Sequence, residues 1–520
     1  MPDLKGGRRG TLWWVLPGFA LFAVLRLPSF FEPHWYADEA SYVAVANELL
    51  HGHVLYAQIW NNKPPLQSWT IAAVVSIFGP SEAGLHLLTF ASGFATLAAV
   101  AYAALRLLGR RRAAVAVVLA GIALGLPVLD AELALPESLL IAPVAWAGAL
   151  LFVHLDPRAK VGPARTLALW PIAVGALIAA GIAYQQTVVA EAAAFGLALA
   201  LSPRARWRDL AAYTATVTVI TGAWVTAAIL QAGATRVGFA IAGFYIPYTQ
   251  SVLPSNGSEV LLHLAGIGSA VALIVVGALL CRRMSTSMWA VWLWAGASLS
   301  IAALARQPYA HYLTAAAAPV ALVLAGLPIP SRIRAFEPLR ILRVAPLVAG
   351  VLFAAVPARI AGLDWIPEAA PSPAINATRT LLQYYGGAVA TVVHSQAATD
   401  WDACFDWRVA ADQAVVTWVG QQGLAGATAV VWSSEVWVYT LANLPVLVPT
   451  PPIYNDEVLL GGDSGVASFV AGLRPTLIIV TDDAVQNWPG ISRLLDGTTY
   501  HRVLTVSPEA VWARADLLAP

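Results

Sequence analysis

Two groups of charged side chains in the first 65 residues have the types and spacing needed for chemistry beside a phosphate. Asp38 and Glu39 are adjacent, and Lys63 follows in the run Asn61-Asn-Lys-Pro-Pro-Leu66. Adjacent side chains on a helix point about 100° apart, so one carboxylate can face a cavity while the other caps the helix. A carboxylate can act as a general base, and a cation can neutralise charge that develops on a departing phosphate.

A third segment with binding chemistry joins two apolar runs late in the chain. Arg306, Tyr309, His311 and Tyr312 place a guanidinium, an imidazole and two phenols close together in the sequence. These groups suit a phosphate and an attached sugar, because the planar guanidinium binds phosphate with two parallel hydrogen bonds. The alternative is an aromatic belt at the membrane interface that surrounds a neutralised arginine.

Further polar residues lie in the loops on the same side of the predicted membrane domain. Asp130, Glu132 and Glu137 are three candidates for one acidic site. The pattern does not decide among them; we favour Glu137, because Pro136 suits the first turn of a helix and places Glu137 near its N-terminus. The remaining predicted substrate-binding residues are His34, Tyr42 and Tyr245.

Each candidate also has a structural explanation that needs no substrate. Asp38 and Glu137 are suited to capping a helix N-terminus, where carboxylates are favoured by the helix dipole. Lys63 is suited to a contact with lipid headgroups at the membrane surface. The functional interpretation depends on the location of all these residues on one side of the membrane.

The elements that carry these residues are predicted to cross a membrane. The 520 residues are 59% hydrophobic and 11% charged, with a mean hydropathy of +0.69, whereas soluble domains carry about 25% charge. This composition excludes a soluble enzyme, a disordered tail and a fibrous protein. Net charge is +1, and the sequence has no basic stripe interleaved with aromatics, so no nucleic-acid partner is predicted.

Clusters of Lys and Arg between the apolar runs determine the predicted topology, because basic loops stay in the cytoplasm. The first outer loop and the C-terminal part then lie outside. The run 66–79 is too short to span, since 14 residues of helix reach about 21 Å and the hydrocarbon core is about 30 Å thick. We predict an interfacial helix there, a short helix from about Asp38 to Gly52 before it, and eleven transmembrane helices over residues 11–28, 84–107, 113–129, 138–155, 166–184, 188–202, 210–231, 259–281, 287–305, 312–328 and 343–358.

Residues 359–520 differ from the membrane domain, predicted over 1–358, in having more charge and shorter apolar runs. Alternating short strands and amphipathic helices predict a small α/β domain with a mostly parallel sheet. The sequence lacks G-x-G-x-x-G and P-loop motifs, so a nucleotide site is unsupported. The predicted strands are 430–432, 446–448, 477–480 and 503–506, and the predicted helices are 408–421, 464–473 and 483–495.

With these features the sequence resembles the GT-C glycosyltransferases of the protein O-mannosyltransferase and aminoarabinose-transferase (ArnT-like) type. The resemblance rests on the Asp38-Glu39 pair, the run that begins at Lys63, the acidic second loop and the Arg306 to Tyr312 segment. The long first outer loop, the eleven spans and the outer C-terminal domain agree with it. It covers residues 1–330.

The resemblance implies a multi-pass enzyme of the bacterial inner membrane, with its active site and C-terminal domain on the extracytoplasmic side. It implies an inverting transfer of a hexosyl or pentosyl unit from a polyprenyl-phosphate donor to a hydroxyl of a glycan, lipid or protein. By position, Asp38 takes the role of the base, with Glu39 beside it. Lys63 takes the role of contacting the donor phosphate, and we assign Arg306 and His311 to the same phosphate.

No cofactor is predicted to be required. Acids with a nearby histidine leave a divalent cation open, although no H-x-x-E-H or similar short-spaced ligand set occurs in the sequence.

Two other functions fit parts of this pattern. A transporter or flippase of lipid-linked sugars would carry charges within several spans and an inverted repeat, and we find neither pattern in the sequence. A non-catalytic binder of lipid-linked sugars would bind the same donor without a base. The motifs name neither the sugar nor the acceptor.

Overall fold

The computed structural model describes residues 12–156, 169–247, 286–304, 309–327, 381–393, 401–402, 405–406, 408–433, 436–481 and 489–517. The chain divides into two compact units, and each is described here by itself. The first comprises Met1–Leu27, Leu87–Trp224 and Val252–Asp364, and the second comprises Pro28–His86, Val225–Ser251 and Trp365–Pro520.

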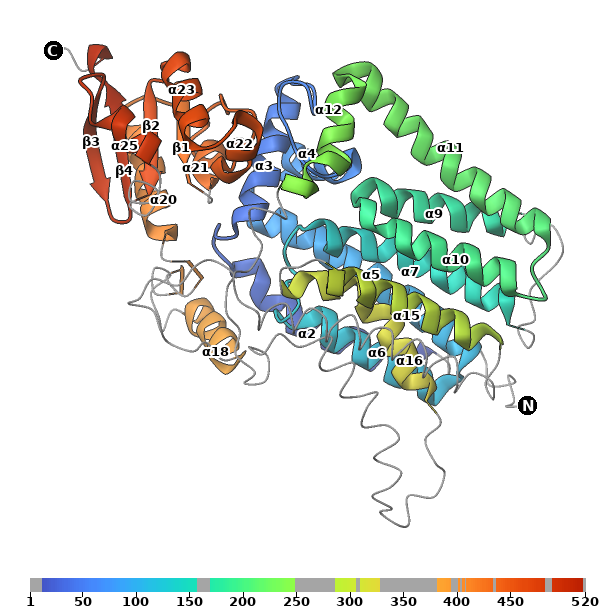
Figure 1. Ribbon diagram of the computed structural model, residues 1–520. Helices are drawn as coiled ribbons and strands as arrows, with labels where there is room; N and C mark the ends of the chain where they lie inside the picture. The colour runs from blue at the N-terminus through green and yellow to red at the C-terminus, as the bar shows by residue number, and fades with distance from the viewer. Residues whose placement is uncertain are drawn as a thin grey trace, which may run out of the picture. The chain divides into compact units, whose positions relative to one another are not determined.

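Apolar helices that follow the predicted spans closely form the first unit (Figure 1). Among the described residues, α5, α7 and α11 are long and apolar enough to cross a membrane. The predicted spans 259–281 and 343–358 lie outside the described residues. Two of these helices continue into the second unit, α5 with its first residues and α11 with its last. The helices are α2 (Leu16–Arg26), α5 (Glu82–Leu107), α6 (Arg110–Gly125), α7 (Pro136–Leu155), α9 (Trp170–Tyr184), α10 (Val189–Leu201), α11 (Trp207–Ala232), α15 (Thr286–Leu304), η4 (Ala310–Ala316) and α16 (Ala317–Gly326).

Small residues let the helices of this unit approach closely. A Cβ atom added to Gly18 on α2 would lie 2.8 Å from the backbone carbon of Val117 on α6. One added to Gly121 on α6 would lie 2.7 Å from the carbonyl oxygen of Gly18. Because lipid tails are as apolar as leucine, membrane helices associate through such close packing rather than through hydrophobic burial.

The two predicted helices of the first loop are confirmed in the second unit. Helix α3 (Ala37–Leu50) carries Asp38 and Glu39 in its first turn, and Gly52 follows it with φ +91°. Helix α4 (Pro65–Phe78) begins directly after Pro64 and ends before Gly79, whose φ is +69°. The left-handed backbone at both glycines stops the chain from continuing as a helix.

The C-terminal part of the second unit holds a four-stranded sheet among short helices (Figure 1). The strand order is β1-β2-β4-β3, with β1 parallel to β2 and the other two pairs antiparallel. The elements are α18 (Leu381–Val392), α20 (Val409–Gln421), β1 (Ala429–Trp432), α21 (Trp437–Leu441), α22 (Ile453–Leu460), α23 (Asp463–Leu473), β2 (Leu477–Thr481), α25 (Pro489–Leu495), β3 (Tyr500–Val506) and β4 (Glu509–Arg514).

The prediction of a mostly parallel sheet is therefore wrong. β3 and β4 are separated by only two residues, and so short a connection allows only an antiparallel pair. The predicted strand 446–448 is also wrong, since Val446 makes only an isolated bridge to Ala429. Its N–H is donated to Glu48 instead.

The other predicted elements of this domain are largely confirmed. β1, β2 and β3 match three of the predicted strands, and α20 and α23 match two predicted helices. Of the predicted helix 483–495, residues 489–495 form α25 and residues 483–488 lie outside the described residues.

Candidate functional site

Asp38 lies in the first turn of α3, half-buried, while its neighbour Glu39 is fully buried. The Tyr454 hydroxyl from the first turn of α22 lies 3.5 Å from Oδ1 of Asp38, at the long limit of a hydrogen bond. The two adjacent carboxylates thus have different environments, as their angular separation on a helix requires.

Lys63 is half-buried in the extended segment that leads into α4. Its N–H donates to Oδ1 of Asn61 at 3.2 Å, and its carbonyl oxygen accepts a 2.6 Å hydrogen bond from the Tyr56 hydroxyl. The Tyr245 hydroxyl donates to the carbonyl oxygen of Asn62 at 3.2 Å. The backbone on both sides of the lysine is therefore held by side chains.

Burial keeps Tyr56 a hydrogen-bond donor. Removal from water raises the pKa of its phenol, and the nearby Tyr245 adds to the rise. Because the phenol stays protonated, its bond to the Lys63 carbonyl oxygen persists at physiological pH.

The C-terminal α/β domain packs directly on the first-loop segment. The Trp60 N–H donates to the carbonyl oxygen of Pro449 at 2.8 Å, and the Val446 N–H donates to Oε1 of Glu48 at 3.0 Å. Further along, the Tyr384 hydroxyl donates to Oε1 of Glu32 at 2.5 Å. These bonds attach both the α3 segment and the approach to Lys63 to the same domain.

His34 takes part in this packing. Its Nε2 lies 2.9 Å from the carbonyl oxygen of Pro80, and its ring meets Trp437 edge-on at 4.6 Å. Burial lowers its pKa, and the bond to the Pro80 carbonyl opposes that shift. Tyr42 is buried on α3.

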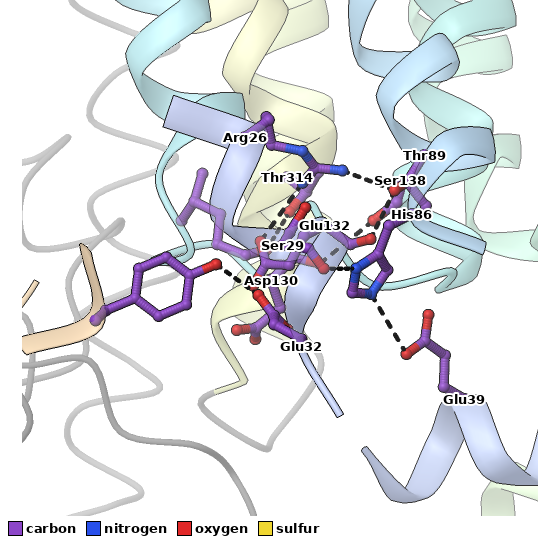
Figure 2. A network of polar contacts seen from close by, with 12 residues as sticks. Arg26, Ser29, Glu32, Glu39, His86, Thr89, Asp130, Glu132, Ser138 and Thr314 are labelled. Carbon is purple, nitrogen blue, oxygen red and sulfur yellow. Dashed lines mark hydrogen bonds and ion pairs between the residues drawn. The ribbon is translucent and has the colours of Figure 1, made fainter. Parts of the chain in front are cut away.

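A buried group of acids around a histidine lies beside the first turn of α3. Nε2 of His86 is 3.6 Å from Glu82 and 4.0 Å from Glu39, and its Nδ1 bonds to the carbonyl oxygen of Ser29. Figure 2 shows the ring between Ser29 and Glu39. One ligand atom from each of the three side chains lies within 4.8 Å of the others, so the group could hold a metal ion.

Glu137, in the first turn of α7, is buried in the first unit. Its Oε1 accepts a 2.7 Å hydrogen bond from Nε2 of Gln185. A small pocket lies beside this pair, and its polar lining is Glu137, Gln185, Thr187, Glu191 and Tyr312. Glu191 is itself held by Ser298 at 3.0 Å.

The other two candidate acids of the second loop have different partners in the first unit. Glu132 lies 3.5 Å from the guanidinium of Arg26, and both side chains are buried; Figure 2 shows this pair. Asp130 lies 3.8 Å from Nδ1 of His311. The His311 ring stacks on Tyr309 and meets Tyr312 edge-on.

The structure thus divides the predicted site residues between its two units. Asp38, Glu39, Lys63, Tyr42, His34 and Tyr245 belong to the second unit, and Glu137, Tyr309, His311 and Tyr312 belong to the first. Arg306 lies outside the described residues.

Several polar residues of these sites are not among the residues predicted from the sequence. The four-residue spacing of Glu82 and His86, at the start of an apolar run, was a signal for the acid and histidine group. Gln185 lies in the break between two apolar runs and Glu191 lies just inside the second run. Polar residues at such places in a membrane protein merit attention. Tyr454 had no sequence signal, because only the fold brings it to Asp38.

Residues 62–229 match the family model described as dolichyl-phosphate-mannose-protein mannosyltransferase. ArnT from Cupriavidus metallidurans, crystallised with undecaprenyl phosphate, superposes with a TM-score of 0.62 at 16% identity over 98% of this chain and 99% of ArnT. The apo form of the same protein superposes with a TM-score of 0.60, also at 16% identity. The match covers 98% of this chain and 100% of that chain. The chain has the ArnT fold.

The same fold extends to a more distant protein. The oligosaccharyltransferase AglB from Archaeoglobus fulgidus, in complex with an inhibitory peptide and a dolichol-phosphate, gives a TM-score of 0.51 at 12% identity. The match covers 99% of this chain and 75% of AglB. No curated protein matches the chain by sequence. The expected ArnT-like fold with a small C-terminal sheet is therefore confirmed.

Proposed function

We propose that the protein is an integral-membrane, inverting glycosyltransferase that moves a sugar from a polyprenyl-phosphate donor to an acceptor hydroxyl. Asp38 is the general base, and Lys63 binds the donor phosphate. We place this site and the C-terminal domain on the outer face of the bacterial inner membrane.

One observation carries the assignment of these two residues. A single segment of the α/β domain contacts α3 and the approach to Lys63: its Tyr454 reaches Asp38, and its Pro449 binds Trp60, three residues before the lysine. Contacts to one segment can hold the base and the phosphate-binding cation at a fixed distance and orientation. A displacement reaction requires such a fixed geometry.

The reaction needs little beyond these groups. Asp38 takes the proton of the acceptor hydroxyl as its oxygen attacks the anomeric carbon from the face opposite the phosphate. The bond from the anomeric carbon to the phosphate oxygen breaks, and its electron pair leaves with the polyprenyl phosphate. Lys63 offsets the charge that builds on that phosphate. No step requires a metal ion.

The solved relatives support the choice of donor. ArnT was crystallised with undecaprenyl phosphate and AglB with dolichol-phosphate, and we extend this class of lipid to the present chain. A lipid-borne phosphate also explains why the chemistry is built beside apolar helices, since the polyprenyl tail can stay in the bilayer.

A transfer assay tests the proposal. The purified protein in liposomes is offered undecaprenyl phosphates that carry mannose, arabinose or aminoarabinose, with the envelope fraction of the source cells as acceptor. We expect one donor to be consumed and the product to have the opposite anomeric configuration by NMR. Consumption of none, or a product with retained configuration, would contradict the proposal.

A further inference from the structure

We propose that Tyr454 of the C-terminal domain is a positioning residue of the reaction centre, whose hydroxyl holds the Asp38 carboxylate in the orientation that accepts the proton. This inference rests on the proposed function and adds the α/β domain to the catalytic machinery. The Tyr454 hydroxyl donates to Oδ1 of Asp38 at 3.5 Å, although the residues are 416 positions apart in the chain.

Buried hydrogen bonds fix the position of Tyr454. The Thr450 N–H donates to Oδ1 of Asp456 at 3.1 Å, and the Thr450 hydroxyl donates to the carbonyl oxygen of Pro452 at 3.1 Å. Thr450 and Asp456 are both buried. These bonds define the turn that enters α22, so its first-turn residue Tyr454 is presented in one place.

The same segment is attached to α3 at a second point. Val446 donates its N–H to Glu48, which lies ten residues after Asp38 on α3. One contact therefore lies near each end of this helix. Two attachment points restrict both sliding and rotation of α3 against the domain, which a single contact would not.

The chemistry of the contact suits a positioning role. A phenol donates one hydrogen, so the bond from Tyr454 engages only one of the two oxygens of the carboxylate. Hydrogen bonds to a carboxylate are normally shorter than this one, and catalytic hydrogen bonds are often long before substrate binds and tighten in the complex. Both side chains are half-buried, so the contact is not sealed within the core.

Kinetics separate positioning from simple packing. We expect Tyr454→Phe to lower kcat about 3- to 10-fold, which is the size of effect that loss of one hydrogen bond produces. The KM for the donor should stay within about twofold, because Lys63 and not Tyr454 binds the phosphate. The matched control is Tyr500→Phe, which removes a hydroxyl that donates to Pro475 in the same domain at 3.1 Å and should leave both constants unchanged.

A spectroscopic measurement tests the contact without relying on activity. 3-Fluorotyrosine is placed at position 454 of the full chain, and its ¹⁹F resonance is compared in the wild type and in Asp38→Asn. We expect the resonance to shift, whereas Asp402→Asn, on a domain carboxylate bonded to Gln413, should not move it.

The outcomes separate this inference from the proposed function. A 454 resonance that does not respond to Asp38→Asn, or a Tyr454→Phe variant with wild-type kcat, overturns the inference and leaves the proposed function intact. A fully active Asp38→Asn variant overturns the base assignment, and the positioning role falls with it.

Discussion

The Tyr56 hydroxyl donates a 2.6 Å hydrogen bond to the carbonyl oxygen of Lys63. This bond holds the backbone of the lysine immediately before Pro64 and Pro65. The proline rings fix φ at these two positions, and Pro64 also restricts the backbone of Lys63 itself. A lysine side chain is flexible, so a fixed backbone limits the volume that its ammonium group searches. The arrangement is suited to binding one phosphate near the N-terminus of α4.

Removal of the Lys63 charge should weaken binding of the lipid phosphate. We expect Lys63→Ala to raise the Kd for undecaprenyl phosphate about 10- to 100-fold, since hydrogen bonds to charged groups contribute ~1.5–3 kcal/mol. Isothermal titration calorimetry in detergent measures this change. Arg236→Ala, which removes an exposed cation in the same unit, should leave the Kd unchanged, and equal losses in both variants would show non-specific attraction only.

Tyr56→Phe should also weaken binding of the lipid phosphate, but less than Lys63→Ala does. The variant keeps the aromatic ring and removes only the bond to the Lys63 carbonyl oxygen, so we expect the Kd for undecaprenyl phosphate to rise about 2- to 10-fold. In the double variant with Lys63→Ala the tyrosine change should add nothing, because its effect acts through the lysine. Additive losses would place Tyr56 in direct contact with the ligand.

The Glu137–Gln185 pair should be required for stability of the first unit. Glu137→Ala leaves the buried Gln185 amide without its 2.7 Å partner, at a cost of about 1–3 kcal/mol. We expect a lower melting temperature by differential scanning fluorimetry. The exchanged double variant Glu137→Gln with Gln185→Glu should recover most of the lost melting temperature. A double variant as unstable as Glu137→Ala would show that the carboxylate is needed at position 137 for another reason.

Chelation should not abolish transfer, because the proposed displacement uses a carboxylate base and a phosphate leaving group. We expect dialysis against EDTA to leave the rate within about twofold of the untreated protein. The opposite result would be a loss that Zn²⁺ or Mn²⁺ restores. If His86→Ala prevented that rescue, the buried group of Glu39, Glu82 and His86 would be identified as the metal site.

Stability of the α/β domain should depend on the ionisation of Asp456. Burial raises the pKa of this carboxyl well above its usual range, with the bond from Thr450 acting in the opposite direction. The folded state therefore holds the proton more tightly than the unfolded state, so this stabilisation is full below the unfolded pKa and is lost as pH rises through the folded pKa.

Asp456→Asn keeps the acceptor oxygen and removes this titration. We expect its melting temperature to fall less than that of the wild type as pH rises above about 4, where an unfolded aspartate ionises. Fluorimetry across pH 4–8 measures the two curves, and parallel curves would show that Asp456 does not titrate in this interval.

The membrane helices could be predicted well because a lipid environment leaves the backbone few choices. A chain in hydrocarbon must satisfy its own hydrogen bonds, so a long apolar run such as 84–107 becomes a helix, as α5 does. Helix α3 could be predicted equally well, because its signals are local in the sequence. Acids stand in its first turn, and Gly52 follows its last turn.

Relationships between distant segments could not be predicted in the same way. The antiparallel placement of β4 depends on the turn after β3 and on the open edge of β2. The packing of His34 on Trp437 and the approach of Tyr454 to Asp38 join residues about 400 positions apart. No local pattern encodes such contacts, because they depend on how two distant segments of the chain meet.

The most direct test of the account is the transfer rate of Asp38→Asn in the liposome assay, alongside its affinity for undecaprenyl phosphate. The amide keeps the size of the carboxylate but cannot take a proton. We expect the rate to fall about 10²- to 10⁴-fold, the usual contribution of a general base, with lipid affinity unchanged. A variant that transfers sugar at a rate close to that of the wild type would contradict the account.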